Sequence, residues 1–275
     1  MDWYVFIILN FVKSENPIYI LIFHEIFLEY FQHFILGDNS PHYEDGPEWD
    51  EVFDNMKFVV NQFHNNFPDT QIIPALGNHD SSPPDNFADV HLKGAEKEFY
   101  SEFITKGALG DFLNHSYDNV RQSFVENCGF YVLKSPNLYH DEFNITQTFI
   151  VLNTNLYYNN KAKTNPDDPC DQLALLESHL TNVMENENVF IVGHVPPGFF
   201  DLYPSTAFYN NENITRKMMD IVTRDENAKK IVAHFYGHTH ISSFRLLSHS
   251  SNTDSPNGIA FIAPSITPRV SSFAK

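Results

Sequence analysis

The pentapeptide YGHTH at residues 236–240 follows a mostly apolar run, residues 231–235. Such a run is typical of a buried strand, and Gly237 is typical of a sharp turn at its end. Two histidines spaced two residues apart can converge on one point only where the backbone leaves regular strand geometry, and a glycine turn allows this. Because imidazole nitrogen is a strong ligand for zinc and related ions, His238 and His240 are a candidate metal-binding pair.

The same pattern, an apolar run followed by glycine and polar side chains, occurs at three other places. The runs are residues 34–36, 71–75 and 189–192, and they lead into Asp38, into Asn78 and His79, and into His194. A single histidine after a strand is more often a hydrogen-bonded loop residue than a ligand. Active sites of open α/β sheets lie at the carboxyl ends of strands. Four such loops in one chain therefore favour one shared site.

Helical periodicity between these runs predicts an α/β fold. Helices are expected at 47–67, 168–185 and 213–227, with two more in 95–127, and further strands at 129–133, 148–152 and 259–263. The chain shows no internal repeat or low-complexity linker, so we expect a single domain. Periodicity alone does not distinguish one doubly wound sheet from two packed sheets.

The composition argues against a nucleic acid polymer as partner. The 275 residues carry 17 basic and 35 acidic side chains, a formal net charge of −18, whereas phosphate backbones require Lys and Arg. The acidity suits a soluble protein of an acidic compartment, where 14 histidines would reduce the net negative charge as the pH falls. A plain solubility role for the acidic residues is an equal alternative.

The remaining signals concern the compartment. Cys128 and Cys170 are the only cysteines, and they form either one bridge or two free thiols. The sequons at Asn114, Asn144 and Asn213 become meaningful only in a secreted protein. Residues 1–33 contain two apolar runs, 3–12 and 18–27, both shorter than the roughly 18 residues of a membrane span. This segment is predicted to be a poor signal peptide or a disrupted N-terminus.

The ordered set of motifs GD, GNHD, GH and GHTH, between Gly37 and His240, resembles the calcineurin-like metallophosphoesterases. GDNSPH at 37–42, LNTNLYY at 152–158, GHVPPG at 193–198 and APSITP at 263–268 resemble the acid sphingomyelinase branch, and LNTNLYY and APSITP its sphingomyelinase-like phosphodiesterases. The resemblance covers residues 34–270. It implies a four-layer α/β sandwich of two mixed sheets flanked by helices, with a catalytic domain at 34–275.

The resemblance also implies roles for single residues. Asp38 would bridge two metal ions, which in the family are zinc. Asn78, His194 and His238 would complete one metal site, and His240 would belong to the other. His79 and His42 would be catalytic histidines, and Asp80 would orient His79.

These implied roles agree with phosphoryl-transfer chemistry. Two divalent ions about 3.5–4 Å apart clamp a phosphoryl group and generate a hydroxide for in-line attack. An imidazolium can protonate the departing oxygen. The mixed nitrogen and oxygen ligands favour zinc, with manganese and iron left open.

The chain departs from the family pattern at three points. The family opens with an Asp-x-His motif, and none precedes Asp38. The sequence Asp89-Val90-His91 falls out of order and is predicted to be a loop or helix start. Ser242 stands where the family commonly has an acidic residue, and relatives continue beyond Lys275. We therefore expect a partial form of the family sequence, with one zinc per chain and residues 1–33 as an atypical N-terminal segment.

The leading hypothesis is a secreted or lysosomal metal-dependent phosphoric diester hydrolase. Its substrate would be a phosphodiester lipid head group or a nucleotide-like small molecule. The alternative is a catalytically impaired relative that acts as a non-enzymatic metal- or ligand-binding protein. A secreted binding protein on the same scaffold is a third hypothesis. The missing first motif is the feature that separates the first two.

Overall fold

The larger of the two main β-sheets has six strands. The computed structural model describes residues 4–5, 12–13, 16–17, 22–27, 30–40, 47–68, 70–113, 118–135, 146–200, 203–249 and 255–265. The strands of the larger sheet lie in the order β13 (Ser243–Leu247), β14 (Gly258–Ile262), β12 (Ile231–Tyr236), β9 (Glu187–Val192), β8 (Thr146–Val151) and β7 (Tyr131–Ser135). The four inner strands are parallel, and β13 and β7 pair antiparallel at the two edges.

The smaller sheet brings two further parallel strand ends to the same region. Its order is β1 (Tyr4–Val5), β4 (Ile22–Phe27), β5 (Tyr30–Ile35) and β6 (Gln71–Pro74). Strands β5 and β6 are parallel, whereas β4 forms an antiparallel hairpin with β5. Two short antiparallel pairs complete the strands, β2 (Val12–Lys13) with β3 (Asn16–Pro17) and β10 (Phe199–Phe200) with β11 (Tyr203–Ala207).

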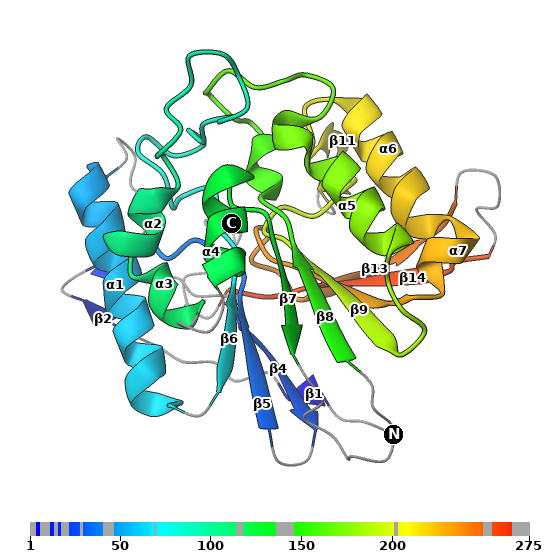
Figure 1. Cartoon of the computed structure of the whole chain (residues 1–275), viewed down its shortest axis with the longest axis horizontal. Helices are drawn as coiled ribbons and strands as arrows, with labels where there is room; N and C mark the ends of the chain where they lie inside the picture. The colour runs from blue at the N-terminus through cyan, green and yellow to red at the C-terminus, as the bar shows by residue number, and fades with distance from the viewer. Residues whose placement is uncertain are drawn as a thin grey trace.

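Helices flank the strands on both sides, as Figure 1 shows. On one side lie α1 (Trp49–Asn66), α2 (Ser101–Thr105), α3 (Leu109–Phe112) and α4 (Asp118–Glu126). On the other lie α5 (Gln172–Thr181), α6 (Glu212–Thr223) and α7 (Asp225–Ala228), and the 3-10 turns are Thr154–Leu156 and Pro169–Asp171. In α1 the predicted apolar spacing becomes a buried face that includes Val52, Met56, Val59 and Phe63, and acidic residues in its first turn complement the helix dipole.

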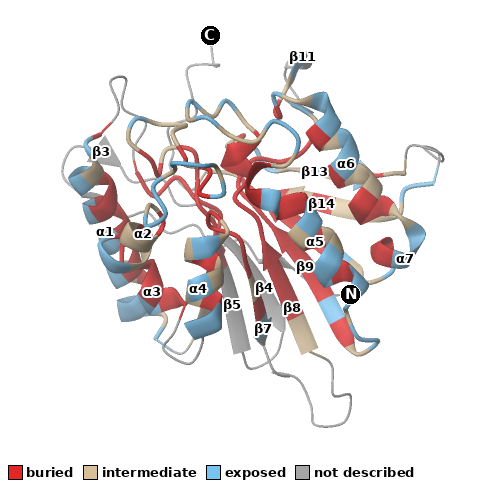
Figure 2. Cartoon of the chain, turned by 45° about the horizontal axis from the view of Figure 1, so that its top comes forward, coloured by how far each residue is buried: buried red, intermediate tan, exposed pale blue. Residues whose placement is uncertain are grey.

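A stack of phenylalanines joins the two sheets. Phe34 on β5 lies 4.7 Å from Phe235 on β12 and 5.7 Å from Phe149 on β8, between ring centroids. Phe149 in turn stacks on Phe190 of β9 at 5.3 Å. Buried aromatic rings of this kind contribute large apolar area and prefer tilted or offset contacts. In Figure 2 the buried residues concentrate in β8 and β9 and in the loops that follow them.

The structure confirms the α/β class and the arrangement of two mixed sheets flanked by helices. The predicted helix at 168–185 is shorter in the structure, where α5 ends at Thr181, and the one at 213–227 is divided into α6 and α7. Two helices were predicted in 95–127, and the described residues of this range form three. Strand β13 was not predicted, because it is an edge strand on which the large apolar side chains Phe244 and Leu246 are exposed. The β4–β5 hairpin was missed because His24 and Glu25 interrupt its apolar run.

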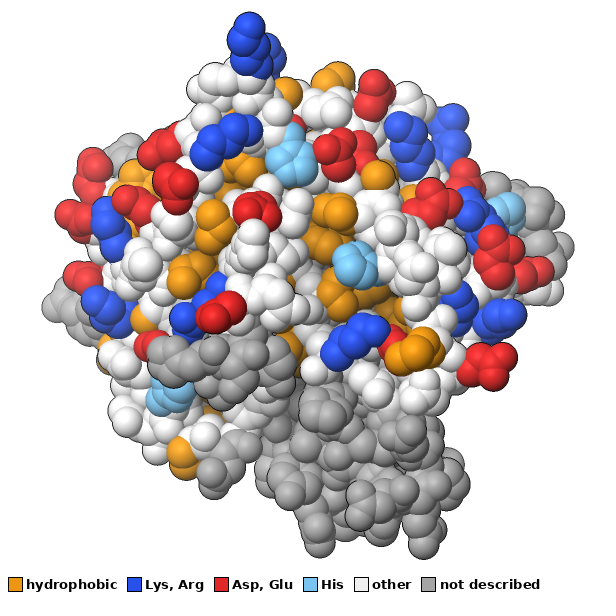
Figure 3. All heavy atoms as spheres, in the orientation of Figure 1, with side chains coloured by type: hydrophobic (Ala, Val, Ile, Leu, Met, Phe, Trp, Pro, Cys, Tyr) orange, Lys and Arg blue, Asp and Glu red, His pale blue; other side chains and the backbone are white. Residues whose placement is uncertain are grey.

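On the face drawn in Figure 3, acidic and basic side chains are interspersed. Among the described helices, none combines the length and apolar character required to cross a bilayer.

One buried histidine makes folding stability depend on pH. His234 on β12 is 1% exposed, and burial lowers its pKa from 6.5 to about 3. Between pH 6.5 and pH 3, His234 is therefore protonated in the unfolded chain and neutral in the folded chain. The free energy of unfolding thus decreases as the pH falls from 6.5 toward 3. At pH 5 the neutral His234 lowers the free energy of unfolding by about 2 kcal/mol relative to neutral pH.

We predict that His234→Gln removes this loss. Urea unfolding at pH 7.5 and pH 5 should show the wild type losing about 2 kcal/mol more than the variant between the two conditions. Equal losses in the two proteins would contradict the assignment of His234.

Candidate metal centre

Four side chains from four strand ends converge between the two sheets. Asp38 follows β5 and Asn78 follows β6, so these two come from parallel neighbours of the smaller sheet. His194 follows β9 and His238 follows β12, parallel neighbours of the larger sheet. Asp38, Asn78 and His194 are at most 5% exposed. The structure thus brings together loops of two sheets, whereas the sequence pattern pointed to one edge, and the role of these residues as ligands stays a prediction.

The donor atoms lie within hydrogen-bond distance of one another. Asn78 Oδ1 is 3.0 Å from His194 Nε2 and 3.0 Å from His238 Nδ1. The two imidazole nitrogens are 3.3 Å apart, and Asp38 Oδ2 is 3.3 Å from His194 Nε2. One amide oxygen and two ring nitrogens thus lie within 3.3 Å of one another, and the Asp38 carboxylate adjoins one of those nitrogens.

This spacing fits a divalent transition ion. Metal–nitrogen and metal–oxygen bonds of 2.0–2.1 Å in tetrahedral geometry place neighbouring donor atoms about 3.4 Å apart. The observed separations of 3.0 and 3.3 Å are close to that value. The mixture of one carboxylate, one amide oxygen and two imidazoles is also a donor set that suits zinc and its neighbours.

Glycines allow the strand ends to approach. A Cβ atom at Gly37 would fall on the backbone of Gly77, and one at Gly77 on the backbone and carboxylate of Asp38. Asp38 itself has φ 56°, in the left-handed region that non-glycine residues seldom adopt. His238 and His240 share that conformation, with φ 68° and 60°. Such strained positions cluster at functional sites.

His194 is held in one orientation from both sides. Its Nδ1–H donates to the carbonyl oxygen of Leu36 at 2.5 Å, which leaves the Nε2 lone pair facing the cluster. Its backbone N–H and that of Val195 donate to the hydroxyl of Thr154, at 3.1 and 2.7 Å. A hydrogen bond on the far nitrogen is the usual way in which a ligating histidine is oriented. Thr154 was not singled out from the sequence, although it lies in the LNTNLYY segment.

Asp80 ties the two loops of the smaller sheet together. Its carboxylate accepts hydrogen bonds from the backbone of Asn39 at 2.6 Å, from the Asn39 amide at 3.0 Å and from the backbone of Gly77 at 2.8 Å. Asp80 is fully buried. The described bonds thus give Asp80 a loop-joining role, and its orientation of His79 stays a prediction.

The electrostatics of the cluster favour a positive charge at its centre. Burial and the nearby charge of Asp38 raise the pKa of Asp80 to about 7. Burial alone would lower the pKa of His194, but the carboxylate of Asp38 reverses this and raises it. Burial and the neighbouring His194 lower the pKa of His238 well below its usual value. The same carboxylate therefore makes protonation easier at His194 than at His238.

The other predicted residues lie as follows. The backbone N–H of His79 donates to Asp38 Oδ1 at 2.9 Å. His240 and His79 are both close enough to lower the pKa of His238 electrostatically. His42 lies outside the described residues, so its role stays a prediction.

Aromatic side chains and one arginine flank His238. The rings of Tyr158 and Phe208 lie 4.6 and 5.5 Å from its ring, both nearly perpendicular. The Arg245 guanidinium lies 5.3 Å from the Phe208 centroid and donates to the carbonyls of Pro197 and Phe199 at 2.5 and 2.6 Å. Arg245 thus fixes the loop after His194. No pattern in the sequence marked it.

The Asp89-x-His91 segment belongs to a different cluster. His91 Nδ1 pairs with Asp171 Oδ2 at 2.8 Å, and its Nε2 is 2.9 Å from the carbonyl oxygen of Glu126. Asp89 accepts from the backbone of Asn165 at 2.9 Å. As predicted, this segment is a loop, and both ring nitrogens of His91 are engaged there.

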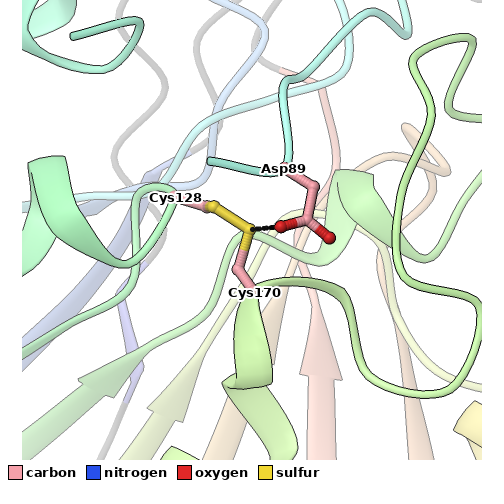
Figure 4. A group of neighbouring side chains, drawn as sticks. All are labelled: Asp89, Cys128 and Cys170. Carbon is pink, nitrogen blue, oxygen red and sulfur yellow. Dashed lines mark hydrogen bonds between the residues drawn. A yellow bond between two sulfur atoms is a disulfide. The ribbon is translucent and has the colours of Figure 1, made fainter. Parts of the chain in front are cut away.

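The cysteines resolve the open alternative in favour of a bridge. Cys128 and Cys170 form a disulfide with Cα atoms 6.2 Å apart, and Asp89 Oδ1 lies 3.2 Å from Cys170 Sγ (Figure 4). The carboxylate and the two sulfurs lie within 4.8 Å of one another. Because both sulfurs are consumed in the disulfide, they offer no thiolate to a metal.

Comparisons with known proteins agree with these motifs. Residues 15–242 match the family model described as calcineurin-like phosphoesterase. The chain is 35% identical over 226 residues to the cyclic GMP-AMP phosphodiesterase SMPDL3A of Rattus norvegicus, covering 79% of this chain and 44% of the relative.

Two further relatives are similar over comparable lengths. Acid sphingomyelinase-like phosphodiesterase 3b of Homo sapiens is 31% identical to this chain, and the matched region covers 84% of this chain and 47% of the relative. Sphingomyelinase phosphodiesterase C of Dictyostelium discoideum is 30% identical, covering 86% and 50%. The chain thus spans about half the length of the curated relatives it matches.

The hydroxyl of Thr154 generates a testable prediction. Thr154→Val keeps the side-chain shape but leaves the backbone N–H groups of His194 and Val195 without their acceptor. Since each buried unsatisfied donor costs about 1–3 kcal/mol, we expect the free energy of unfolding to fall by about 2–6 kcal/mol. Urea denaturation followed by circular dichroism measures this. Thr154→Ser, which retains the hydroxyl, should lose less than half as much; equal losses in both variants would refute the assignment.

Proposed function

Because the chain belongs to the calcineurin-like phosphoesterase family, we propose that it is a metal-dependent phosphoric diester hydrolase. The observation that carries the proposal is the convergence of Asp38, Asn78, His194 and His238 at separations of 3.0 to 3.3 Å. The names of the similar proteins, all phosphodiesterases, support the same reaction class.

The four converging residues would hold the first ion, which we propose is zinc. Asp38 would also contribute to a second ion, together with His240. When bound, such ions stabilise charge on the phosphoryl oxygens and lower the pKa of a water molecule. The chain's own contribution is to fix these ligands, through the Leu36 carbonyl on His194 and the two hydrogen bonds to the Thr154 hydroxyl.

His79 is proposed to deliver the proton that the leaving oxygen requires. Its backbone N–H donates a hydrogen bond to the carboxylate of Asp38, so the residue lies next to the proposed metal ligands. An imidazolium suits this role because its ordinary pKa lies near the working pH of many enzymes. His42 is proposed as a second catalytic histidine on the basis of the motif alone.

The substrate is proposed to be a small organic phosphodiester, either a lipid head group or a nucleotide-like molecule. The rings of Tyr158 and Phe208 beside His238 form an apolar wall against which the organic part could pack. The disulfide supports a secreted or lysosomal location, because disulfides persist in oxidising compartments. Asn213, exposed in the first turn of α6, is a suitable glycosylation acceptor there.

Metal content tests the proposal directly. We predict that the protein purified without chelators retains about one zinc per chain and that His194→Ala and His238→Ala each abolish it. His91→Ala serves as the matched control, since both nitrogens of His91 are bonded elsewhere, and it should retain the metal. Elemental analysis of the four proteins measures the outcome.

Two outcomes would change the conclusion. Equal metal content in the wild type and in both ligand variants would refute the site. Loss of metal in those variants without diester hydrolysis by the wild type would favour the alternative, a metal-binding protein that is not an enzyme.

His79 should affect turnover and leave metal content unchanged. We predict that His79→Ala lowers the rate on an alkyl phosphodiester by roughly 10²–10⁴-fold. A nitrophenyl ester should be less affected, because its leaving group requires little protonation. Rates on the two substrates, with metal content as the control, decide the question: equal losses would argue against proton delivery by His79.

A further inference from the structure

The side-chain amide of Asn78 has two chemically different ends, and they face opposite environments. Its Oδ1 lies 3.0 Å from His194 Nε2 and 3.0 Å from His238 Nδ1. Its Nδ2–H donates to Asp85 Oδ1 at 3.0 Å. Rotation of the amide by half a turn would bring its N–H groups to the ring nitrogens and its oxygen against the Asp85 carboxylate. With a cation among the donor atoms, only the observed orientation satisfies both sides, because the amide oxygen then faces the cation and the amide N–H faces the Asp85 carboxylate.

Asp85 is itself fixed by the loop that carries Asn78. Its backbone N–H donates to the carbonyl oxygen of Asn78 at 2.9 Å, and its own carbonyl accepts from the backbone of Lys161 at 2.5 Å. The residue has φ 64°, a left-handed conformation that aspartate adopts more readily than most non-glycine residues. The half-buried carboxylate is thus held against the Asn78 amide by main-chain contacts.

We propose that Asp85 is a positioning residue of the metal centre, which orients the Asn78 amide so that its oxygen faces the ion. This inference rests on the proposed metal site. The carboxylate accepts from the amide nitrogen and repels the amide oxygen, so it favours the orientation in which the oxygen points toward His194 and His238. Groups that orient metal ligands in this way typically change metal affinity by 10–100-fold when removed.

Cobalt binding to metal-free protein provides the test. Asp85→Ala should weaken the affinity for Co²⁺ by about tenfold or more and alter the visible absorption spectrum of the bound ion. Asp85→Asn can still present an amide oxygen to Asn78 Nδ2, so it should restore most of the affinity. Asp85→Ser replaces the alanine variant if that protein does not fold, as judged by circular dichroism of the metal-free form.

The substitution Asn78→Asp separates orientation from a general structural role. A carboxylate at position 78 has no wrong orientation and would be repelled by Asp85. In that background we expect Asp85→Ala to leave the Co²⁺ affinity unchanged or to raise it. A tenfold loss in both backgrounds would overturn the inference, as would wild-type affinity in Asp85→Ala. Failure of the wild type to bind Co²⁺ would instead refute the proposed metal site.

Discussion

The backbones of Gly37 and Gly77 lie so close that neither position has room for a side chain. This contact joins the loops after two parallel strands, and it places Asp38 and Asn78 next to each other. The Asp80 carboxylate secures the same junction by accepting from Gly77 and from Asn39. An alanine at either glycine would force these loops apart and separate the first two ligands of the candidate centre.

The larger sheet is coupled to this junction by several hydrogen bonds, among them those from His194 Nδ1 to the Leu36 carbonyl and from the Asn155 amide to the Leu76 carbonyl. Asp38, His238 and His240 all have left-handed backbones, each of which costs about 1–3 kcal/mol. Stacked rings behind the site, above all Phe34 against Phe235, hold the sheets together and offset this cost. Part of the backbone strain of the described residues thus lies where the ligands converge, and the stacked rings pack behind it.

Local sequence predicted much of this arrangement, because an apolar run followed by glycine and a ligand is a short-range pattern. It predicted the strand ends that carry Asp38, Asn78, His194 and His238, but not that the first two belong to one sheet and the last two to another. It did not reveal the contacts of Asp80 with Asn39, of Thr154 with His194 or of Arg245 with Pro197. Each of these joins residues about 40 or more positions apart, so no local spacing encodes it. Asp89-x-His91 shows the converse. Its spacing matches that of a metal-binding motif, but its side chains contact Asp171 and the backbone of Asn165 instead.

The protonation of the centre reflects an excess of negative charge. Burial and Asp38 together raise the pKa of Asp80 to about 7, and Asp38 also raises the pKa of His194 even though burial opposes it. Both shifts reflect the charge of the Asp38 carboxylate in a buried site. Either a proton on His194 or a divalent ion bound by the four side chains would offset the negative charge of Asp38 at this site. Because ligation requires neutral imidazole, the two compete, and acidity and metal occupancy of this site are necessarily linked.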